Sequence, residues 1–318
     1  MNSLPLSWSV IKSKKSDHII IDKWNLRWHA INFSPSSDYK IYFDQFEDPN
    51  SDIIIRGCNA ELEKALSGFG FSSIQFGMEA VLNTSDDHFN KKSLKKLIKR
   101  GNRHGIIEKI KFSVENKTKL NDFKKFTSHS NEPQLKNLFQ TEFSEENNLY
   151  VFKKFTDDWL GAILISQNSN EKLHAELILR HSNAPVGIME ALVHYVFEEA
   201  KSNGWNELSL GEVPFKIEHR SFDLRSNAIK SAGKLINFAY NHNGLYNFKN
   251  KFQPRWENLY ICSSSKLRIK HILFILFYSN FHKLLAHKLF YIIKKYIVWL
   301  FDKNFRIFIP KQLDFNKT

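Results

Sequence analysis

Cysteine is almost absent from this chain, which has only Cys58 and Cys262 in 318 residues. Two cysteines cannot build the disulfide framework of a small secreted domain, and neither a Cys-x-x-Cys nor a His-x-x-x-His pair is present to bind a metal. The segment that contains Lys12, Lys14 and Lys15 is not followed by a sustained apolar core, so it lacks the pattern of a signal peptide. We therefore expect a reducing compartment and no structural metal.

Glycine is missing where two common ligand-binding loops would need it. Gly68 and Gly70 lie in Gly-Phe-Gly-Phe-Ser-Ser, which lacks the third glycine of a dinucleotide-binding loop and does not follow a convincing buried strand. The pyrophosphate loop of ordinary acetyltransferases, Arg/Gln-x-x-Gly-x-Gly/Ala, would need glycine where this chain has Arg103. These absences argue against a Rossmann fold and against acetyl-CoA as a donor.

Long apolar runs are missing as well, because the longest is about half of the twenty residues that a membrane-spanning helix needs. Residues 266–318 are nonetheless both apolar and basic, with eleven Lys and Arg against two acids, so they hold +9 of the formal net charge of +13. On a helix, the polar residues of this tail share an arc of about 140°. They are Lys283, His287, Lys288, Lys294, Lys295 and Asp302. Such a helix is typical of a membrane interface, and a helical hairpin packed on the protein body is the alternative.

Hydrophobic periodicity predicts a globular chain with both strands and helices, in line with 42% hydrophobic and 25% charged residues. Expected strands span residues 16–21, 39–43, 53–56, 72–82, 159–166, 173–179 and 205–210. Expected helices span residues 60–66, 91–105 and 187–203, and helical pieces are expected around Phe123 and Leu138 in a polar connection, residues 116–148. The order of elements in the second half favours a mixed sheet rich in antiparallel pairs.

The most distinctive stretch is 244–260, Gly-Leu-Tyr-Asn-Phe-Lys-Asn-Lys-Phe-Gln-Pro-Arg-Trp-Glu-Asn-Leu-Tyr. Lys249, Lys251 and Arg255 stand here among five aromatic residues, and Glu257 follows them. Aromatic rings can anchor such a segment to a core while the three cations face an anionic partner. On composition alone, a basic surface turn before an edge strand is the simpler interpretation.

This stretch resembles the closing motif of the synthase domain of phosphatidylglycerol lysyltransferases, the aminoacyl-phosphatidylglycerol synthases of the multiple peptide resistance family. Two further blocks support the resemblance. Arg180-His-Ser-Asn-Ala-Pro-Val-Gly-Ile-Met-Glu190 is similar to the family's Arg…Gly-x-Met-Asp/Glu, and Ser209-Leu-Gly-Glu-Val-Pro214 is similar to its Ser-Leu-Gly-x-x-Pro. The similarity runs from about Ile53 to Cys262.

The resemblance implies an α+β fold of two fused acetyltransferase-like (GNAT) lobes with mixed sheets. We expect a first lobe in residues 1–120, connecting helices and a second lobe in residues 121–262, and a basic, aromatic, amphipathic tail in residues 263–318, without a flippase region. The family moves an amino acid from aminoacyl-tRNA to the hydroxyl of a lipid such as phosphatidylglycerol, and no cofactor is expected. The expected partners are aminoacyl-tRNA, an anionic lipid and the inner face of the cell membrane, contacted from the cytoplasm through residues 266–309.

Exchange of one ester for another requires aligned substrates, a base for the alcohol and support for an oxyanion, but no covalent nucleophile. The resemblance nominates Glu257 to bind the ammonium of the amino acid or act as base, Lys249 to support the oxyanion, and Arg180 to hold a phosphate. Further substrate-binding candidates are Lys251, Arg255, Glu190, Ser209, Gly211 and Glu79, although a solvent-facing strand position is the simpler interpretation of Glu79. The basic helix adds Lys99, Arg100 and Arg103 as contacts for tRNA phosphates.

One position departs from the family's pattern. The family usually has an acid three residues before the arginine of the middle block, where this chain has Leu177. The neighbouring Glu176 is offset by one residue, which on a regular strand turns its side chain to the opposite face. The identity of the amino acid, and activity itself, are open for that reason.

Several alternatives stay open on the sequence. Glu257 and Arg255 could instead form a structural ion pair between the lobes. His181 and His194 lie near the matched blocks and offer other bases, although an isolated histidine is more often structural. The fold could also serve another acyl donor or acceptor, or a membrane-bound binding module without catalysis.

Overall fold

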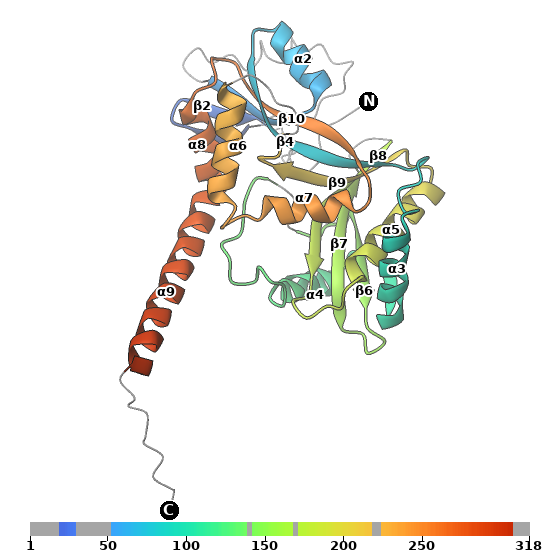
Figure 1. Cartoon of the computed structure of the whole chain (residues 1–318). Coiled ribbons are helices and arrows are strands. Elements are labelled where there is room, and N and C mark those ends of the chain that lie inside the picture. The colour runs from blue at the N-terminus through green and yellow to red at the C-terminus, as the bar shows by residue number, and fades with distance from the viewer. Residues whose placement is uncertain (1–18, 30–51, 139–141, 168–170, 218–223, 308–318) are drawn as a thin grey trace, which may run out of the picture.

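The computed structural model describes residues 19–29, 52–138, 142–167, 171–217 and 224–307, and its strands form one continuous mixed sheet (Figure 1). The order across the sheet is β1-β2-β3-β10-β4-β9-β8-β7-β6-β5. The strands are β1 Ile19–Lys23, β2 Leu26–His29, β3 Asp52–Cys58, β4 Ser72–Asn83, β5 Ile106–Ile110, β6 Asn147–Lys153, β7 Trp159–Gln167, β8 Lys172–Arg180, β9 Glu207–Pro214 and β10 Arg255–Ser263. The predicted fold, with helices and strands and a mixed sheet, is confirmed.

Two of the described pairings are parallel, β2 with β3 and β8 with β9, and the others are antiparallel. The ladder between β8 and β9 is short, and runs from Lys172 opposite Glu207 to His174 opposite Ser209. Beyond it, β8 continues alongside β7, whereas β9 continues alongside β4. The two strands therefore separate in the middle of the sheet, and beyond this point their backbone groups no longer form hydrogen bonds with each other.

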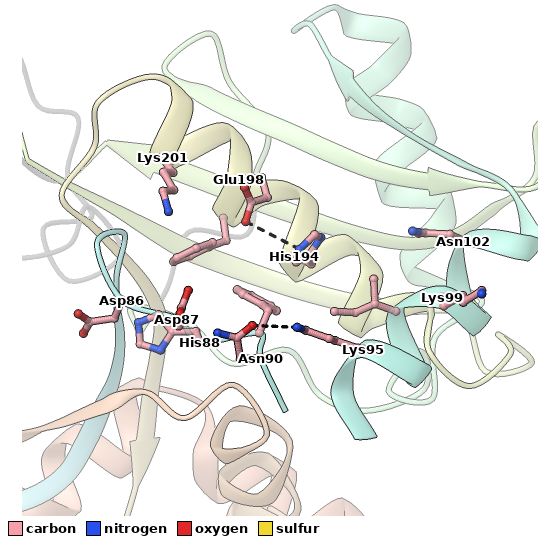
Figure 2. A pocket seen from close by; sticks show the side chains of 13 residues that line it. Asp86, Asp87, His88, Asn90, Lys95, Lys99, Asn102, His194, Glu198 and Lys201 are labelled. Carbon is pink, nitrogen blue, oxygen red and sulfur yellow. Dashed lines mark hydrogen bonds and ion pairs between the residues drawn. The ribbon is translucent and has the colours of Figure 1, made fainter. Parts of the chain in front are cut away.

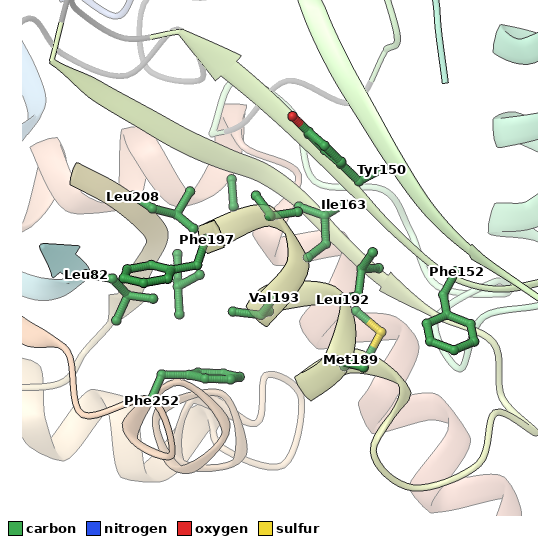
Figure 3. Close-up of a cluster of buried hydrophobic side chains, with 14 of the residues drawn as sticks. Leu82, Tyr150, Phe152, Ile163, Met189, Leu192, Val193, Phe197, Leu208 and Phe252 are labelled. Atoms are coloured by element: carbon green, nitrogen blue, oxygen red, sulfur yellow. The ribbon is translucent and has the colours of Figure 1, made fainter. Parts of the chain in front are cut away.

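Helix α5, Ile188–Ser202, covers one face of the sheet and is the centre of the largest apolar cluster (Figure 3). Leu192, Val193 and Phe197 of this helix are buried there, at the helical spacing that the sequence predicts. Tyr150 and Phe152 of β6 reach the same cluster from the sheet. The helix is thus held by burial of its apolar side, which contributes about 25 cal/mol for each Å² removed from water.

Helix α3, Lys92–Gly101, and the 3-10 turn η1, Asn102–His104, pack against the start of α5. Two glycines allow this close approach. A Cβ on Gly101 would lie 2.3 Å from the carbonyl oxygen of Gly187, and Gly187 itself has a φ of +103°, which favours glycine. The basic helix is therefore fixed to the layer that carries α5.

The opposite face of the same strands is covered by α4, Val114–Lys124, because Leu149 and Val151 alternate with the two β6 residues that face α5. At the other end of the sheet, α2, Ala60–Gly68, covers one face of β3. Helices α6, Leu224–Ile236, and α8, Ile269–Tyr278, contribute to the cluster on its other face. The core is thus divided between the two faces of a single sheet.

Helix α7, His242–Asn250, contacts β9, and its end leads into β10. Helix α9, Phe281–Ile307, begins in the core with Phe281 and Leu284 buried and then runs away from the body (Figure 1). Among the residues with described positions, no helix combines the length and the apolar character needed to cross a membrane.

The helices expected at residues 60–66 and 187–203 are confirmed as α2 and α5, and the basic helix at 91–105 corresponds to α3 with the turn after it. Two expectations are wrong. No helix surrounds Leu138 in the part of the chain that the structure describes. Strand β10 is not an edge strand, because β3 and β4 flank it on both sides. The strand expected at residues 39–43 lies outside the described residues.

Candidate active site

A row of polar side chains, buried at its centre and half-buried at Glu257 of β10, crosses four neighbouring strands, β10, β4, β9 and β8. Its centre is Glu79 of β4, which is 3% exposed. The Glu79 carboxylate accepts hydrogen bonds from the Ser209 hydroxyl at 2.5 Å and from the Lys172 ammonium at 3.0 Å. It also lies 3.4 Å from Nδ1 of His174. The interpretation of Glu79 as a solvent-facing residue is therefore wrong, because its charge is paired inside the sheet.

The charges of this pair support each other. Burial raises the pKa of Glu79, but the charge of Lys172 and the hydrogen bonds to the carboxylate outweigh it, so this pKa is below its ordinary value. Burial lowers the pKa of Lys172, and the carboxylates of Glu79, Glu257 and Glu207 more than offset it, so this pKa is raised. Lys172 lies 3.8 Å from Glu257 and 3.9 Å from Glu207. Both members of the pair are therefore charged at neutral pH.

Lys249 reaches the same strands from helix α7 and is also buried. Its ammonium donates a hydrogen bond to the carbonyl oxygen of Glu212 in β9 at 3.0 Å. Burial lowers the pKa of Lys249 to about 7, although the carboxylates of Glu212 and Glu79 favour the charged form. Both protonation states are thus populated near neutral pH, so this side chain can accept or donate a proton.

Gly211 lies beside Lys249, where β8 and β9 separate. Its φ of +84° favours glycine. A Cβ on Gly211 would lie 3.4 Å from the Ala175 carbonyl oxygen, 3.6 Å from Nζ of Lys249 and 3.9 Å from Cε1 of His174. Because Gly211 has no side chain, the space at its Cβ position between β8 and β9 is bordered by both the Lys249 ammonium and the His174 imidazole.

The carboxylate of Glu212 is bound by Arg56 of β3, whose guanidinium lies 5.6 Å from the centroid of the Phe76 ring. This ion pair partly neutralises Glu212 and so weakens its hold on the proton of Lys249. The sequence reasoning missed Arg56, Lys172 and His174. For the two β8 residues a signal was present, because polar residues alternate there with the apolar residues of a predicted strand.

The sequence candidates that lie in this region are Glu79, Ser209, Gly211, Lys249 and Glu257. Arg255 joins them from the surface, because its guanidinium donates to Glu257 at 2.5 Å and to Glu207 at 2.6 Å. Glu257 and Arg255 thus form an ion pair within β10, and not one that joins two lobes. Glu257 faces cations from two strands, Lys172 of β8 and Arg255 of β10.

The candidates Lys251, Glu190 and Arg180 lie outside this row of contacts. Lys251 donates to Glu190 at 2.7 Å and links the end of α7 to the first turn of α5. Arg180, at the end of β8, donates to the carbonyl oxygen of Ala184 at 2.5 Å. Along the strand it lies roughly 25 Å from Lys172. No described contact joins Arg180 to Lys249, Lys251 or Glu257.

A β-bulge in β8 alters the alternation of its side chains between the two faces of the sheet. It lies next to Leu177, the position at which the chain departs from the family's pattern. The pairing with β7 skips Glu176, which makes it the extra residue. Leu177 packs in the cluster under α4, and the Glu176 carboxylate accepts a hydrogen bond from Ser166 at 2.5 Å. Ser166 alternates with Ile165 of the α5 cluster, so it lies on the α4 side. The expectation that Glu176 and Leu177 face opposite ways is therefore wrong.

The candidates for tRNA phosphates, Lys99, Arg100 and Arg103, are exposed at the end of α3 and in the turn after it. A pocket of about 460 Å³ opens between α3, α5 and the loop after β4 (Figure 2). Its charged lining residues are Asp86, Asp87, Glu198, Lys95, Lys99 and Lys201. Because the two signs balance, the lining does not by itself select an anion.

The two histidines that the sequence offers as bases have other surroundings. His194 lines this pocket, where burial lowers its pKa, and it lies 3.8 Å from Glu198 (Figure 2). His181 stacks on the Phe126 ring at 5.9 Å. Within the described residues, no group of three or more His, Cys, Asp or Glu side chains is arranged to hold a metal ion.

Comparisons with known proteins agree with this architecture. The model of the family described as phosphatidylglycerol lysyltransferase, C-terminal, matches residues 42–263. No curated protein matches the chain. The structure of L-PGS from Bacillus licheniformis is similar with a TM-score of 0.65 and 20% identity, over 80% of this chain and 81% of that one. The C-terminal domain of a putative lysylphosphatidylglycerol synthetase from Agrobacterium fabrum has a TM-score of 0.61 and 17% identity, over 76% and 78% of the two chains. At these identities the two structures establish a shared fold.

Proposed function

Because the chain belongs to the family of phosphatidylglycerol lysyltransferase C-terminal domains, we propose that it transfers an amino acid from aminoacyl-tRNA to the hydroxyl of a membrane lipid such as phosphatidylglycerol. The family is one of transferases, and aminoacylation of a lipid is the general activity that this membership supports. Of the two solved structures compared above, one is named L-PGS and the other a putative lysylphosphatidylglycerol synthetase. The donor, the acceptor and the roles of single residues are the specific parts of the proposal.

The observation that carries the proposal is the buried Lys249 at the point where β8 and β9 separate. In its neutral form, Lys249 accepts the proton of the lipid hydroxyl as that oxygen attacks the ester carbonyl. The ester bond to the ribose oxygen then breaks, and the Lys249 ammonium returns the proton to this leaving oxygen. Atoms and charge balance without a covalent enzyme intermediate, in agreement with a transfer between two esters of similar energy.

The other members of the network position Lys249 and bind the amino acid. The ion pair of Glu79 and Lys172 joins β4 to β8, and Ser209 of β9 donates a hydrogen bond to the same carboxylate. These contacts fix the positions of the strands around Gly211 before substrates bind. Glu257, at the exposed end of the row, is our candidate for the ammonium group of the amino acid. The proposal for Arg180 and Lys251 is that they hold phosphate groups near the start of α5.

The donor is expected to contact the basic end of α3. Changing Lys99, Arg100 and Arg103 together to alanine should raise the KM for aminoacyl-tRNA and leave kcat nearly unchanged, because phosphate contacts supply affinity without touching the reacting ester. The slope of log affinity against log salt should fall by about 2 to 3, since each lost contact removes about 0.7 to 0.9.

The matched control for this variant replaces Lys117 and Lys119 of α4 and Lys125 directly after it with alanine. It changes the net charge by the same amount on another part of the protein. If both triple variants lose the same affinity, the effect is one of overall charge and α3 is not the binding surface.

The activity itself can be tested with purified protein, pools of charged tRNA and vesicles that contain phosphatidylglycerol. We expect the extracted lipid to gain the mass of an aminoacyl group with at least one pool, and to gain none when the tRNA is deacylated first. Absence of any aminoacyl-lipid with every pool would contradict the proposal. The identity of the successful pool would name the amino acid.

The acceptor requires that the enzyme reach a membrane, and we propose contact with the inner face of the cell membrane through residues 266–309. The support is the exposed course of α9 beyond its first turns, together with the excess of basic residues in the tail. An apolar helix bordered by lysines binds anionic lipid surfaces.

A further inference from the structure

The two-residue turn between β1 and β2 holds a tryptophan in an unusual backbone conformation. Trp24 and Asn25 both have a φ of +57°, as a type I′ hairpin turn requires. Asparagine tolerates this conformation, whereas a bulky side chain is rarely found in it. Trp24 is nevertheless 57% exposed at the tip of the hairpin. One side of the ring packs on Phe274 and Tyr278 of α8, at centroid distances of 5.8 and 5.4 Å, and the exposed remainder is available to a partner.

The Trp24 ring begins a line of aromatic side chains. Its centroid lies 5.4 Å from that of Phe277 in α8. Phe277, itself 45% exposed, stacks on His282 of α9 with the ring centroids 4.3 Å apart and the planes at 9°. Leu273, one turn before Phe277, is exposed on the same side of α8. The line therefore runs from the hairpin tip, over α8, to the first turn of α9.

The same line continues along the exposed part of α9. At about 100° per residue, Leu289 and Ile293 lie within roughly 20° of His282 around the helix axis. They belong to an exposed apolar arc whose other members include Phe290, Tyr296, Ile297 and Trp299. Lys294 and Lys295 lie about 40° beyond the two edges of this arc. The helix thus presents an apolar side that is bordered by cations, and two further apolar residues, Tyr291 and Val298, are exposed on the side between the two lysines.

We infer that the hairpin tip with Trp24, the outer side of α8 and the apolar arc of α9 form one docking surface for a lipid bilayer that contains anionic lipids. Aromatic side chains place their rings at the level of the headgroups, and lysines extend along the apolar surface to reach the phosphates. A protein partner would cover the arc without needing cations on both of its edges. The border of lysines therefore favours the membrane.

This inference rests on the proposed function and adds an orientation to it. A single helix would allow the body to rotate about the axis of α9. Contact by Trp24, which belongs to the sheet through β1 and β2, would hold the sheet at a fixed angle to the bilayer. The hairpin is thus a second anchor, and its strained turn keeps the ring at the surface.

The test is binding of the full-length protein to vesicles of phosphatidylcholine, alone or mixed with phosphatidylglycerol, measured by cosedimentation. In W24N the turn is kept, because asparagine accepts a positive φ. We expect its partition coefficient on the anionic vesicles to fall by on the order of tenfold, and that of I293S to fall similarly, since each loses one apolar side chain that the bilayer would cover. The matched control is F155S, which removes another exposed aromatic ring, 76% exposed in the turn between β6 and β7, and should bind as the parent does.

Equal binding of W24N and the parent protein would overturn the inference, as would a loss of equal size in F155S. A dimer that W24N dissociates, with vesicle binding unchanged, would identify a second copy as the occupant instead. Aminoacylation of phosphatidylglycerol dispersed in detergent, measured in parallel, separates the two proposals. W24N should retain this activity, and its absence in the parent protein would count against the proposed function alone.

Discussion

Replacing Lys249 with methionine is expected to lower kcat/KM for aminoacyl transfer by on the order of 10² to 10⁴, the usual contribution of a positioned acid or base. The same change is expected to stabilise the fold at neutral and acidic pH, because it removes a buried ammonium and fills its place with an apolar chain of similar length. Loss of activity with a gain in stability is the signature of a group kept for chemistry. Initial rates and urea unfolding measure the two effects.

The pH dependence of this effect has a definite sign. Lys249 loses its proton near pH 7 in the folded protein and near its ordinary value of 10.5 when unfolded. Between these values the unfolded chain binds more protons, so the stability of the parent protein rises with pH across this window. The advantage of the methionine variant is therefore largest below about pH 7 and disappears towards pH 10.5. The activity of the parent should rise through about pH 7, as the free amine appears.

The control is K109M, which removes an ammonium that is paired with Glu199 at 2.7 Å on the surface. Its activity and stability should both stay close to those of the parent. A K249M protein that retains its activity would remove Lys249 from the mechanism. A K249M protein that is inactive because it unfolds would be recognised from its unfolding curve.

Replacing Glu79 with alanine is expected to cost about 3 to 5 kcal/mol of folding stability, because Lys172 would remain charged and buried without its main partner. The double variant E79A/K172M should recover most of this loss, since neither member of the pair then leaves its partner's charge buried and unpaired. Neither protein should be active if the pair supports the site. E61A, on the exposed first turn of α2, is the matched control and should change stability by well under 1 kcal/mol.

Acid should act on the same pair. The pKa of Glu79 is lower in the folded protein than in the unfolded chain, so its stabilisation is complete above the ordinary range of a glutamate and is lost as the pH falls through the folded value. The parent protein should thus lose stability in acid more steeply than E79A/K172M. Additive effects of the two single substitutions would show that Glu79 and Lys172 do not interact.

The elements that the sequence predicts well are those with a strong local period. In helix α5 apolar residues recur at each turn, and in strand β4 they recur at every second residue. Both elements are found where expected. Strand β10 could not be placed in this way, because its position between β3 and β4 depends on a pairing between residues about 180 positions apart. The bulge at Glu176 was equally hidden, since nothing local in the sequence marks an extra residue in a strand.

The residues of the candidate site also fall into those that local motifs predict and those whose roles depend on contacts across the sheet. Glu79, Ser209 and Lys249 were found through short motifs, and they do lie around the place where β8 and β9 separate. The alternation in β8 marks Lys172 and His174 as facing one side of the sheet, but it does not show that a carboxylate of β4 pairs with Lys172 there. Pairings of this kind are set by the tertiary fold and cannot be read from the spacing of residues.

The place of β10 has a consequence for how this protein is made. Strands β3 and β4 are neighbours in the chain, yet the slot between them is filled by a strand that a ribosome synthesises about 170 residues later. Until then, a nascent chain presents two open strand edges with buried-type apolar residues, the kind of surface that recruits chaperones or aggregates. The centre of the sheet can close only after β10 has been synthesised, so this strand completes the hydrogen bonding of two strands that were made long before it.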